Sequence, residues 1–322
     1  MNGPRQTRRP PKRQVNGVLM IDKPAGMTSN GVLGVIKRLY NADKAGHTGT
    51  LDPFATGLLP VALGEATKFS GRLIDADKTY LATMRLGVTT TTGDLEGDVL
   101  DTRPVNVNIT AAGISAAMAK FTGAILQVPP MYSALKRDGK PLYEYARAGI
   151  EVERAARSVT IHSLELMAQQ GSDVVFRAAC SKGTYIRTLA EDIGRELGCG
   201  AHLIALRREQ TGGFDLAGAL TLEAIDSAVE TGTADAAAYA ARDTLLLPID
   251  TLIRDLPRVD CSFAEAARLR LGQRLAMHSL GVTDEGLYRV YDEAGALTGL
   301  VQAVSGALRP ERLVAQGSSG RA

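Results

Sequence analysis

A glycine-rich segment, residues 41–60, holds the side chains best suited to chemistry. It reads NADKAGHTGTLDPFATGLLP and carries His47 and, directly before a proline, Asp52. Glycines let a backbone approach a ligand closely, and a residue before proline is held extended, so the Asp52 carboxylate can project from a loop. Taken alone, an Asp-Pro pair equally suits an Asx turn. The segment lacks the G-x-x-x-x-G-K-[ST] spacing of a P-loop, which disfavours nucleoside triphosphate hydrolysis.

Basic and aromatic side chains from two other segments complete a possible site. Tyr80 lies in an alternating segment, and Lys182, Tyr185 and Arg187 lie where a helix is expected to begin. An arginine pairs with a carboxylate, and an aromatic ring stacks on a planar base, so the set suits a site for a flipped-out base. Each residue alone has an ordinary structural role, such as cross-strand packing for Tyr80.

The patterns of apolar residues predict the elements that position these side chains. We expect strands at 17–24, 78–87, 158–167 and 172–180, and helices near 30–40, 109–120 and from Gly183 to Gly198. Residues 41–60 predict a long loop that leads into an apolar segment, and residues 88–98 predict a polar loop. Residues 126–149 predict an irregular, exposed insertion, which is called the excursion below. Strands and helices do not alternate as βαβ units, so we predict an α+β fold with a mixed, largely antiparallel sheet flanked by helices.

A second, smaller unit is expected near the C-terminus. Pro248 and Pro257 bracket a boundary, followed by a helix at 263–271 and a hairpin of 286–292 with 296–304. The last residues, QGSSGRA, are expected to be flexible. Together these features predict a small β-rich module of roughly 60 residues.

Composition and charge exclude several classes of protein. The chain has 322 residues and a net charge of +2, but residues 1–13 hold five basic residues and no acid, so the rest carries −3. We expect residues 1–13 to be a disordered tail, either an arm that touches phosphates or simply a solvated end. No apolar run suggests a membrane span or a secretory leader. Three scattered cysteines suggest a reducing compartment without disulfides or a cysteine-based metal site.

Four motifs in order resemble the TruB family of tRNA pseudouridine synthases. They read GVLMIDKPAGMTSNGV, AGHTGTLDPFATGLLPVALGEATKF, DKTYLATMRLGVTTTTGDLEG and SKGTYIRTLAEDIGRELGCGAHLIALRR, and the resemblance covers roughly residues 17–250. It implies a pseudouridine synthase fold with a catalytic domain at 14–250, an RNA-contacting insertion at about 126–150, a PUA-like RNA-binding domain at 251–312 and a flexible tail at 313–322.

The resemblance also implies an activity and partners. The expected reaction is conversion of uridine 55 in the T arm of tRNA to pseudouridine. No cofactor, metal, guide RNA or membrane is expected, and the protein is expected to be a cytoplasmic monomer. The short C-terminal module and the lack of long lysine-rich tails argue against a guide-RNA-dependent relative. The alternative is a tRNA-binding and folding module in which catalysis is secondary.

The same resemblance implies roles for single residues. Asp52 matches the catalytic aspartate of the family's G-x-L-D-P motif, Tyr80 the tyrosine that stacks on the target base and is proposed to remove the C5 proton, and Arg187 the arginine that pairs with the carboxylate. Further substrate contacts are expected from His47, Leu206, Asp94, Tyr185 and Lys23.

The physics of the reaction agrees with these roles. One carboxylate can serve as a nucleophile, at C1′ or at C6, or as the base that starts elimination from the sugar. It must be ionised in a closed pocket, and a neighbouring arginine opposes the effect of burial on its ionisation. Flipping the base costs a few kcal/mol, and stacking on aromatic side chains offsets it by roughly 1–3 kcal/mol per base.

Overall fold

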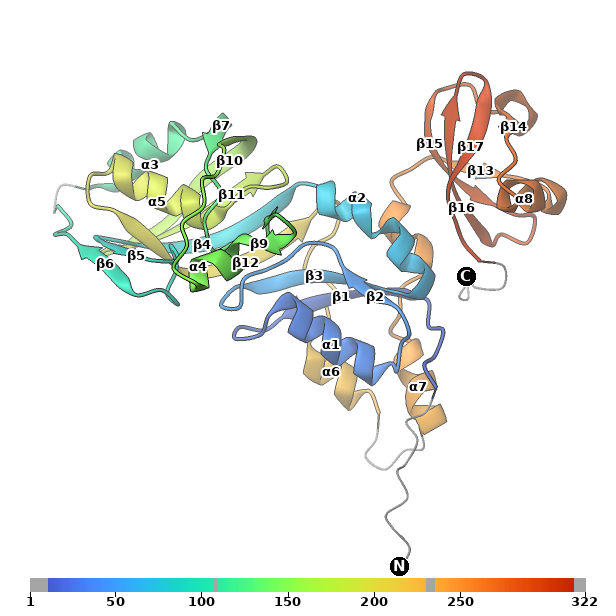
Figure 1. Cartoon of the computed structure of the whole chain (residues 1–322), viewed down its shortest axis with the longest axis horizontal. Coiled ribbons are helices and arrows are strands. Elements are labelled where there is room, and N and C mark those ends of the chain that lie inside the picture. The colour runs from blue at the N-terminus through green and yellow to red at the C-terminus, as the bar shows by residue number, and fades with distance from the viewer. Residues whose placement is uncertain (1–10, 107–108, 230–234, 316–322) are drawn as a thin grey trace, which may run out of the picture.

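The computed structural model describes residues 11–106, 109–229 and 235–315. The molecule is elongated, with a large sheet running through its body and a smaller β-rich unit at one end (Figure 1). The large sheet has the strand order β1-β3-β12-β4-β11-β10-β7, with β2 paired to β3, and the smaller has the order β13-β15-β16-β17-β14. The predicted α+β class is confirmed.

The large sheet is mixed but mostly antiparallel, as predicted. Only β12 on β3 is parallel, at Arg207–Thr56 and Arg208–Gly57. Its strands are β1 (Gly17–Lys23), β2 (Ala45–His47), β3 (Thr56–Leu63), β4 (Lys78–Leu86), β7 (Gly123–Gln127), β10 (Arg157–Gln170), β11 (Asp173–Cys180) and β12 (Ala201–Thr211).

Helices cover this sheet in two groups. Near β4, β10 and β12 lie α3 and α5, and near β1 and β3 lie α1 and α6 (Figure 1). The helical segments of this body are α1 (Ser29–Leu39), η1 (Gly64–Phe69), α2 (Ser70–Asp75), α3 (Ala111–Ala119), α5 (Ile186–Glu196), α6 (Leu222–Ser227), α7 (Asp235–Asp243) and η2 (Ile249–Ile253).

The helix that carries Arg187 follows the sequence pattern closely. In α5, Ile186, Leu189, Ala190 and Ile193 are buried, as the apolar spacing predicted. The helix ends at Glu196 with Leu197 as its C-cap residue, and Gly198 has φ +81°, which is the left-handed conformation that glycine allows after a helix. The start of α1 is likewise determined by neighbouring residues, because the Thr28 hydroxyl accepts a hydrogen bond from the Gly31 amide at 2.9 Å and so caps the helix.

The expected long loop at 41–60 is wrong in part, because it contains β2 and most of β3. Proline usually excludes a central strand, since it has no amide hydrogen. Pro60 is tolerated because it lies between the two partners on that side of β3: β12 pairs only at Thr56 and Gly57, and β2 only from Val61 onward. The Pro60 carbonyl accepts the Thr48 amide at 3.1 Å.

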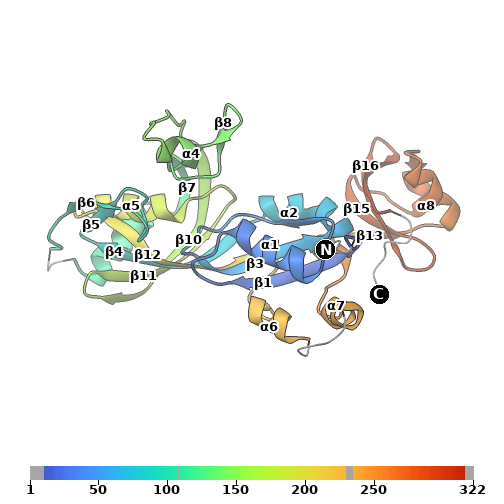
Figure 2. The ribbon, with the colours of Figure 1, turned by 60° about the horizontal axis from the view of Figure 1, so that its bottom comes forward.

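Three other segments have a different local structure from what the sequence patterns indicated. The predicted polar loop at 88–98 begins with β5 (Val88–Thr90), which pairs with β6 (Val99–Thr102) as a hairpin. Strand β12, which no sequence pattern singled out, lies centrally in the sheet between β3 and β4. The excursion at 126–149 contains the end of β7, the short strands β8 (Lys136–Arg137) and β9 (Lys140–Pro141), and α4 (Leu142–Arg147), and it projects from the body (Figure 2).

The C-terminal unit contains the predicted helix and hairpin. Helix α8 begins with a capping box, in which the Ser262 hydroxyl accepts the Glu265 amide and Glu265 accepts the Ser262 amide. Strands β15 and β16 pair antiparallel. The elements are β13 (Arg258–Asp260), α8 (Phe263–Arg270), β14 (Leu275–Ala276), η3 (Met277–Leu280), β15 (Gly286–Tyr291), β16 (Leu297–Val304) and β17 (Ala307–Leu313).

One apolar core joins this unit to the body. Leu252 and Ile253 of η2 are buried with Val18 of β1 and with Tyr291 and Leu300 of the C-terminal sheet. The two units therefore share buried surface at η2 instead of being separated by an exposed linker.

The ends of the described chain are more ordered than the sequence suggested. Residues 1–10 and 316–322, most of the two expected tails, lie outside the described residues. Arg13 belonged to the expected disordered tail, but it pairs with Asp243 at 2.5 Å and stacks on Tyr239 at 4.5 Å. Val314 is buried, and the Ala315 amide donates to Glu65. Contacts with residues distant in the sequence, which sequence patterns do not reveal, hold both segments in place.

Candidate active site

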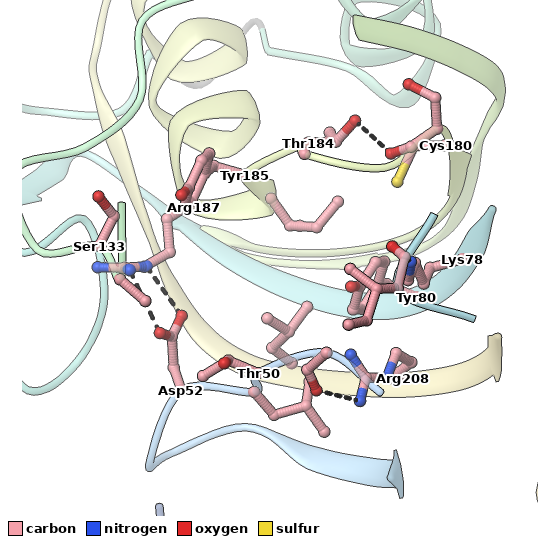
Figure 3. Close-up of a pocket in the computed structure, with 18 of the residues that line it drawn as sticks. Thr50, Asp52, Lys78, Tyr80, Ser133, Cys180, Thr184, Tyr185, Arg187 and Arg208 are labelled. Carbon is pink, nitrogen blue, oxygen red and sulfur yellow. Dashed lines mark hydrogen bonds and ion pairs between the residues drawn. The ribbon is translucent and has the colours of Figure 1, made fainter. Parts of the chain in front are cut away.

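A cavity of about 450 Å³ opens where the 47–52 segment, β4, β12 and the start of α5 meet (Figure 3). Residues 133–135 of the excursion form another part of its wall. Six of the eight site residues expected from the sequence line it: His47, Asp52, Tyr80, Tyr185, Arg187 and Leu206. The remaining two, Lys23 and Asp94, lie behind its wall.

Asp52 and Arg187 form a two-point ion pair at one end of the cavity. Arg187 Nε lies 3.0 Å from Asp52 Oδ2, and Arg187 Nη2 donates to Asp52 Oδ1 at 3.3 Å. The Arg187 side chain is 4% exposed and that of Asp52 33% exposed, so the carboxylate is the member that faces the cavity. The Asp52 carboxylate is thus engaged by an arginine 135 residues away, which sets aside the simple Asx-turn interpretation.

The rest of the Arg187 guanidinium joins three segments of the chain. Nη1 donates to the Thr92 carbonyl at 2.8 Å and lies 3.3 Å from Asp94 Oδ2, while Nη2 donates to the Tyr132 carbonyl at 2.6 Å. The Asp52 loop, the β5–β6 hairpin and the excursion therefore meet on one side chain. Its donors are directed to acceptors, as a buried arginine requires.

Asp94 lies behind Arg187 and contacts its guanidinium group instead of lining the cavity. Its side chain is 4% exposed, and its Oδ1 accepts hydrogen bonds from the Thr92 hydroxyl at 2.5 Å and the Glu96 amide at 3.0 Å. The expected direct contact between Asp94 and substrate does not match this placement, because the carboxylate is enclosed by its own turn and by Arg187. Its position indicates a role in fixing the arginine.

Burial raises the pKa of Asp52 above the usual range for an aspartate. The neighbouring Arg187 and the more distant Lys23 act in the opposite direction, and Asp94 adds to the rise. The carboxylate is therefore held between two opposing effects, and its ionisation depends on Arg187 staying in place.

The loop that carries Asp52 is braced from behind. Lys23 is fully buried, and its Nζ donates to the carbonyls of Pro24, Pro53 and Ala55 at 2.9, 3.1 and 2.7 Å. The Ser29 hydroxyl bonds both the amide and the carbonyl of Leu51, at 2.8 and 3.1 Å. Lys23 was expected to contact substrate, but its ammonium group is directed to the loop backbone, so the structure gives it a positioning role.

The opposite end of the cavity is formed by Tyr80 and its neighbours. Tyr80 on β4 is half-buried and lies directly across from Arg208 on β12, while Leu206 lines the adjacent wall. Burial raises the pKa of Tyr80, and the Arg208 guanidinium beside it acts to lower it. Lys78, two residues before Tyr80, also faces the cavity, and burial lowers its pKa to about 8.

His47 and Tyr185 complete the aromatic lining. His47 Nε2 lies 3.3 Å from Asn30 Oδ1, and burial lowers the pKa of the imidazole, which favours the neutral ring. Tyr185 is the N-cap residue of α5, and the Gln127 side chain clamps its backbone: the Tyr185 amide donates to Gln127 Oε1 at 2.8 Å, and Gln127 Nε2 donates to the Tyr185 carbonyl at 3.1 Å.

Sequence reasoning missed Gln127 and did not place Arg208 in the site. Gln127 ends a strand next to two prolines and gave no signal. Arg208 was visible only as one half of an Arg207-Arg208 pair, and recognising 201–211 as a strand would have shown that the two arginines face opposite sides of a sheet.

Two other features are absent from the described residues. Over 11–106, 109–229 and 235–315, no group of three or more His, Cys, Asp or Glu side chains is arranged to hold a metal ion. In the part of the chain that the structure describes, no helix is long and apolar enough to cross a membrane.

Family models match nearly the whole chain. The N-terminal domain of TruB family pseudouridylate synthases matches residues 37–186, the C-terminal domain of tRNA pseudouridylate synthase B matches 187–254, and the C-terminal region of pseudouridine synthase II TruB matches 257–314.

Comparison with individual proteins gives the same family. The chain is 55% identical over 311 residues to the tRNA pseudouridine synthase B of Burkholderia mallei, covering 95% of this chain and 99% of that one. It is 56% identical to the protein of the same name from Cupriavidus metallidurans, covering 94% and 96%. Among solved structures, a chain of a Cbf5-Nop10-Gar1 complex superposes with a TM-score of 0.70 at 29% identity, covering 93% of this chain and 85% of that chain.

Proposed function

The chain belongs to the TruB family of pseudouridylate synthases and is a pseudouridine synthase, and we propose that it isomerises uridine 55 in the T arm of tRNA. The relatives that it matches over 94–95% of its length are named tRNA pseudouridine synthase B, which supports tRNA as the substrate. A tRNA substrate would place the enzyme in the cytoplasm. We propose that it acts as a monomer without a guide RNA.

In this proposal Asp52 is the catalytic carboxylate. The reaction breaks the N1–C1′ bond of the uridine, turns the uracil and joins C5 to C1′. Asp52 is the carboxylate that lines the cavity, and all three possible routes, attack on C1′, attack on C6 or elimination through a glycal, need it ionised. Arg187 supports that form through its two-point ion pair.

Tyr80 and His47 receive the flipped base. Extrusion of a stacked base costs a few kcal/mol, and each base-to-aromatic stack returns roughly 1–3 kcal/mol. The Tyr80 ring and the neutral His47 ring line the same cavity as Asp52, with Leu206 as an apolar wall. We further propose that the Tyr80 hydroxyl removes the C5 proton.

Backbone contacts to the RNA would come from the excursion. Lys136, Arg137 and Lys140 are exposed on the β8–β9 hairpin, directly after residues 133–135, which line the cavity. Exposed lysine and arginine side chains bind phosphates without reading sequence. We propose that this insertion, at about 126–150, holds the T arm over the cavity and that the C-terminal unit, 251–312, is a second RNA-binding domain.

The observation that carries the proposal is the Asp52–Arg187 pair opposite Tyr80 in one cavity of a TruB-family chain. The test uses an unmodified tRNA transcript labelled with tritium at C5 of uridine, because pseudouridine formation releases that hydrogen to water. Wild-type protein should release tritium, with the product mapped to the T-arm uridine, and Asp52→Asn should bind the tRNA without releasing it.

Two outcomes would count against the proposal. Tritium release by Asp52→Asn at the wild-type rate would remove Asp52 from the chemistry. Tight tRNA binding by the wild type with no release would favour the alternative, a tRNA-folding module.

A further inference from the structure

Arg208 is a buried cation in the cavity wall that no carboxylate neutralises among the described residues. It is 1% exposed, and its guanidinium donates to two backbone carbonyls, from Nε to Leu58 at 2.7 Å and from Nη2 to Gly49 at 3.1 Å. Buried arginines are usually paired with an acid, since an uncompensated charge is costly in a protein interior. A positive charge is therefore retained in the wall of the cavity.

The sheet register places this charge beside Tyr80. Arg208 on β12 is the direct cross-strand partner of Tyr80 on β4. Directly opposed residues project from the same face of a sheet with their Cβ atoms about 4.5–5.5 Å apart. Figure 3 shows the Arg208 guanidinium next to the Tyr80 side chain, at the end of the cavity away from Asp52 and Arg187.

A tyrosine that accepts a proton from carbon must first be a phenolate. Burial opposes this by raising the pKa of Tyr80, so a cation next to the oxygen is needed to favour the charged form. Arg208 acts in that direction. Arginine also stays protonated when buried, so its charge persists across the working range of pH.

The other groups around Tyr80 do not supply this charge. On the same strand, the Lys78 ammonium is directed to three carbonyls near the end of α2, those of Leu73, Ile74 and Ala76. Burial lowers the pKa of Lys78 to about 8, so its charge is lost just above neutral pH.

The remaining titratable neighbours disfavour a phenolate or are uncharged. Burial raises the pKa of the Cys180 thiol on β11 to about 11, so it is neutral. Asp52, across the cavity, raises the pKa of Tyr80 when ionised. His47 on β2 is favoured as the neutral ring. Arg208 is thus the permanent cation on this side of the cavity among the described residues.

We propose that Arg208 is a positioning residue for Tyr80, which holds the phenol oxygen in place and stabilises the phenolate that takes the C5 proton. The inference rests on the proposed general-base role of Tyr80. In that step the C5–H bond of the rotated uracil breaks and its electron pair forms the C5–C6 double bond, while the electron pair of the C6–N1 double bond moves to N1. The proton passes to the phenolate oxygen, and N1 of the ring gains a proton from solvent.

The first test compares pH–rate profiles. In Arg208→Met, the rise of kcat with pH that reports Tyr80 ionisation should move upward by about 1–3 pH units. Arg208→Lys should move it less, because a buried lysine supplies a cation only while its ammonium group stays protonated. The matched control is Arg207→Met, because Arg207 is next in sequence but pairs with Asp22 at 2.7 Å, away from Tyr80. A uniform loss of kcat at every pH, with an unshifted profile, would overturn the proposal and leave Arg208 as a structural residue.

A second test needs no turnover and separates this inference from the proposed function. The chain has nine tyrosines and no tryptophan, so tyrosinate formation can be followed by ultraviolet difference titration. Subtracting the Tyr80→Phe titration from that of the wild type isolates Tyr80. Its transition should move to higher pH in Arg208→Met even if the enzyme acts on another uridine, and an unmoved transition would overturn the inference while leaving the activity intact. Circular dichroism of each variant checks that it is folded.

Discussion

The two ends of the cavity each hold a buried arginine, but the two arginines are partnered in opposite ways. Arg187 is surrounded by carboxylates, with Asp52 at 3.0 Å and Asp94 at 3.3 Å, and by two carbonyls. Arg208 has no carboxylate partner among the described residues: its guanidinium donates to the carbonyls of Leu58 and Gly49 and lies beside Tyr80.

The difference teaches how one cavity can hold two kinds of acid–base group. At the Arg187 end one arginine faces two carboxylates, so its charge is fully compensated and it holds the Asp52 carboxylate ionised and in place. At the Arg208 end the cation is in excess, so the environment favours a new negative charge on a neighbour. Four substitutions would break or sharpen this contrast.

Removing the cation at the Arg187 end should have the largest effect. Arg187→Met leaves Asp52 and Asp94 buried without their cation, and breaking a buried pair typically costs about 3–5 kcal/mol of unfolding free energy. Urea unfolding measures the loss. The double variant Arg187→Met with Asp94→Asn should recover part of it, because one uncompensated charge is removed. A loss close to that of an exposed arginine would contradict the described network.

At the other end, Tyr80→Phe should keep the ring and remove the base. Loss of a general base lowers rates by about 10²–10⁴-fold, while tRNA affinity should stay near that of the wild type because stacking remains. Single-turnover tritium release and filter binding measure the two quantities separately. A near-wild-type rate would show that Tyr80 is not the general base. The different surroundings of Arg187 and Arg208 would then have no part in the acid–base chemistry.

Gly57 of β3 lies against the Arg208 backbone, and its replacement should disturb the Arg208 end of the cavity. Gly57 has φ +102°, and an added Cβ would lie 2.3 Å from the Arg208 carbonyl oxygen. Gly57→Ala should destabilise the protein by about 1–3 kcal/mol more than Gly26→Ala. Gly26 is the matched control because it also has positive φ, +78°, but open space around the Cβ position. Equal losses in thermal unfolding would show that β3 and β12 can separate without cost.

The smallest expected effect concerns the brace behind Asp52. Burial lowers the pKa of Lys23 to about 8 from its ordinary 10.5. Below about pH 8 the lysine is protonated in both states and its burial cost is complete. Between about pH 8 and 10.5 the unfolded chain binds the proton more tightly, so the unfolding free energy rises with pH.

Lys23→Met should abolish this part of the pH dependence. The stability difference, wild type minus variant, should therefore grow by about 1–2 kcal/mol between pH 7 and 9, as measured by urea unfolding at each pH. A difference that stays constant would mean that Lys23 is not desolvated in the folded protein.

Much of the catalytic side of the cavity was predictable from local chemistry. The Gly-rich, Asp-Pro segment indicated an exposed carboxylate, and the 3.6-residue spacing in 186–193 indicated the helix that carries Arg187. These features depend on neighbours a few residues apart, which a sequence displays directly. The ordered motifs then identified the family, because four long patterns in order carry far more information than any one residue.

The roles of Lys23, Asp94 and Arg208 could not be predicted in this way. Each was visible only as a charge, and whether a charge contacts a ligand or a neighbour depends on segments distant in sequence. Strand β3 was missed because a proline such as Pro60 usually ends a strand. Pro60 is tolerated in β3 because it lies between the residues that pair with β12 and those that pair with β2. Only the pairing of the strands in the folded protein shows this.

The sequence by itself determined the family, the helix that carries Arg187 and the residues able to do chemistry, because side-chain type and short-range periodicity are properties of the chain alone. The tertiary structure decided which arginine is neutralised and which keeps its charge. Partners 135 residues apart in one case and 150 and 159 in the other meet only when the sheet forms. Burial then makes the difference in partners matter, since charges interact strongly only where water is excluded.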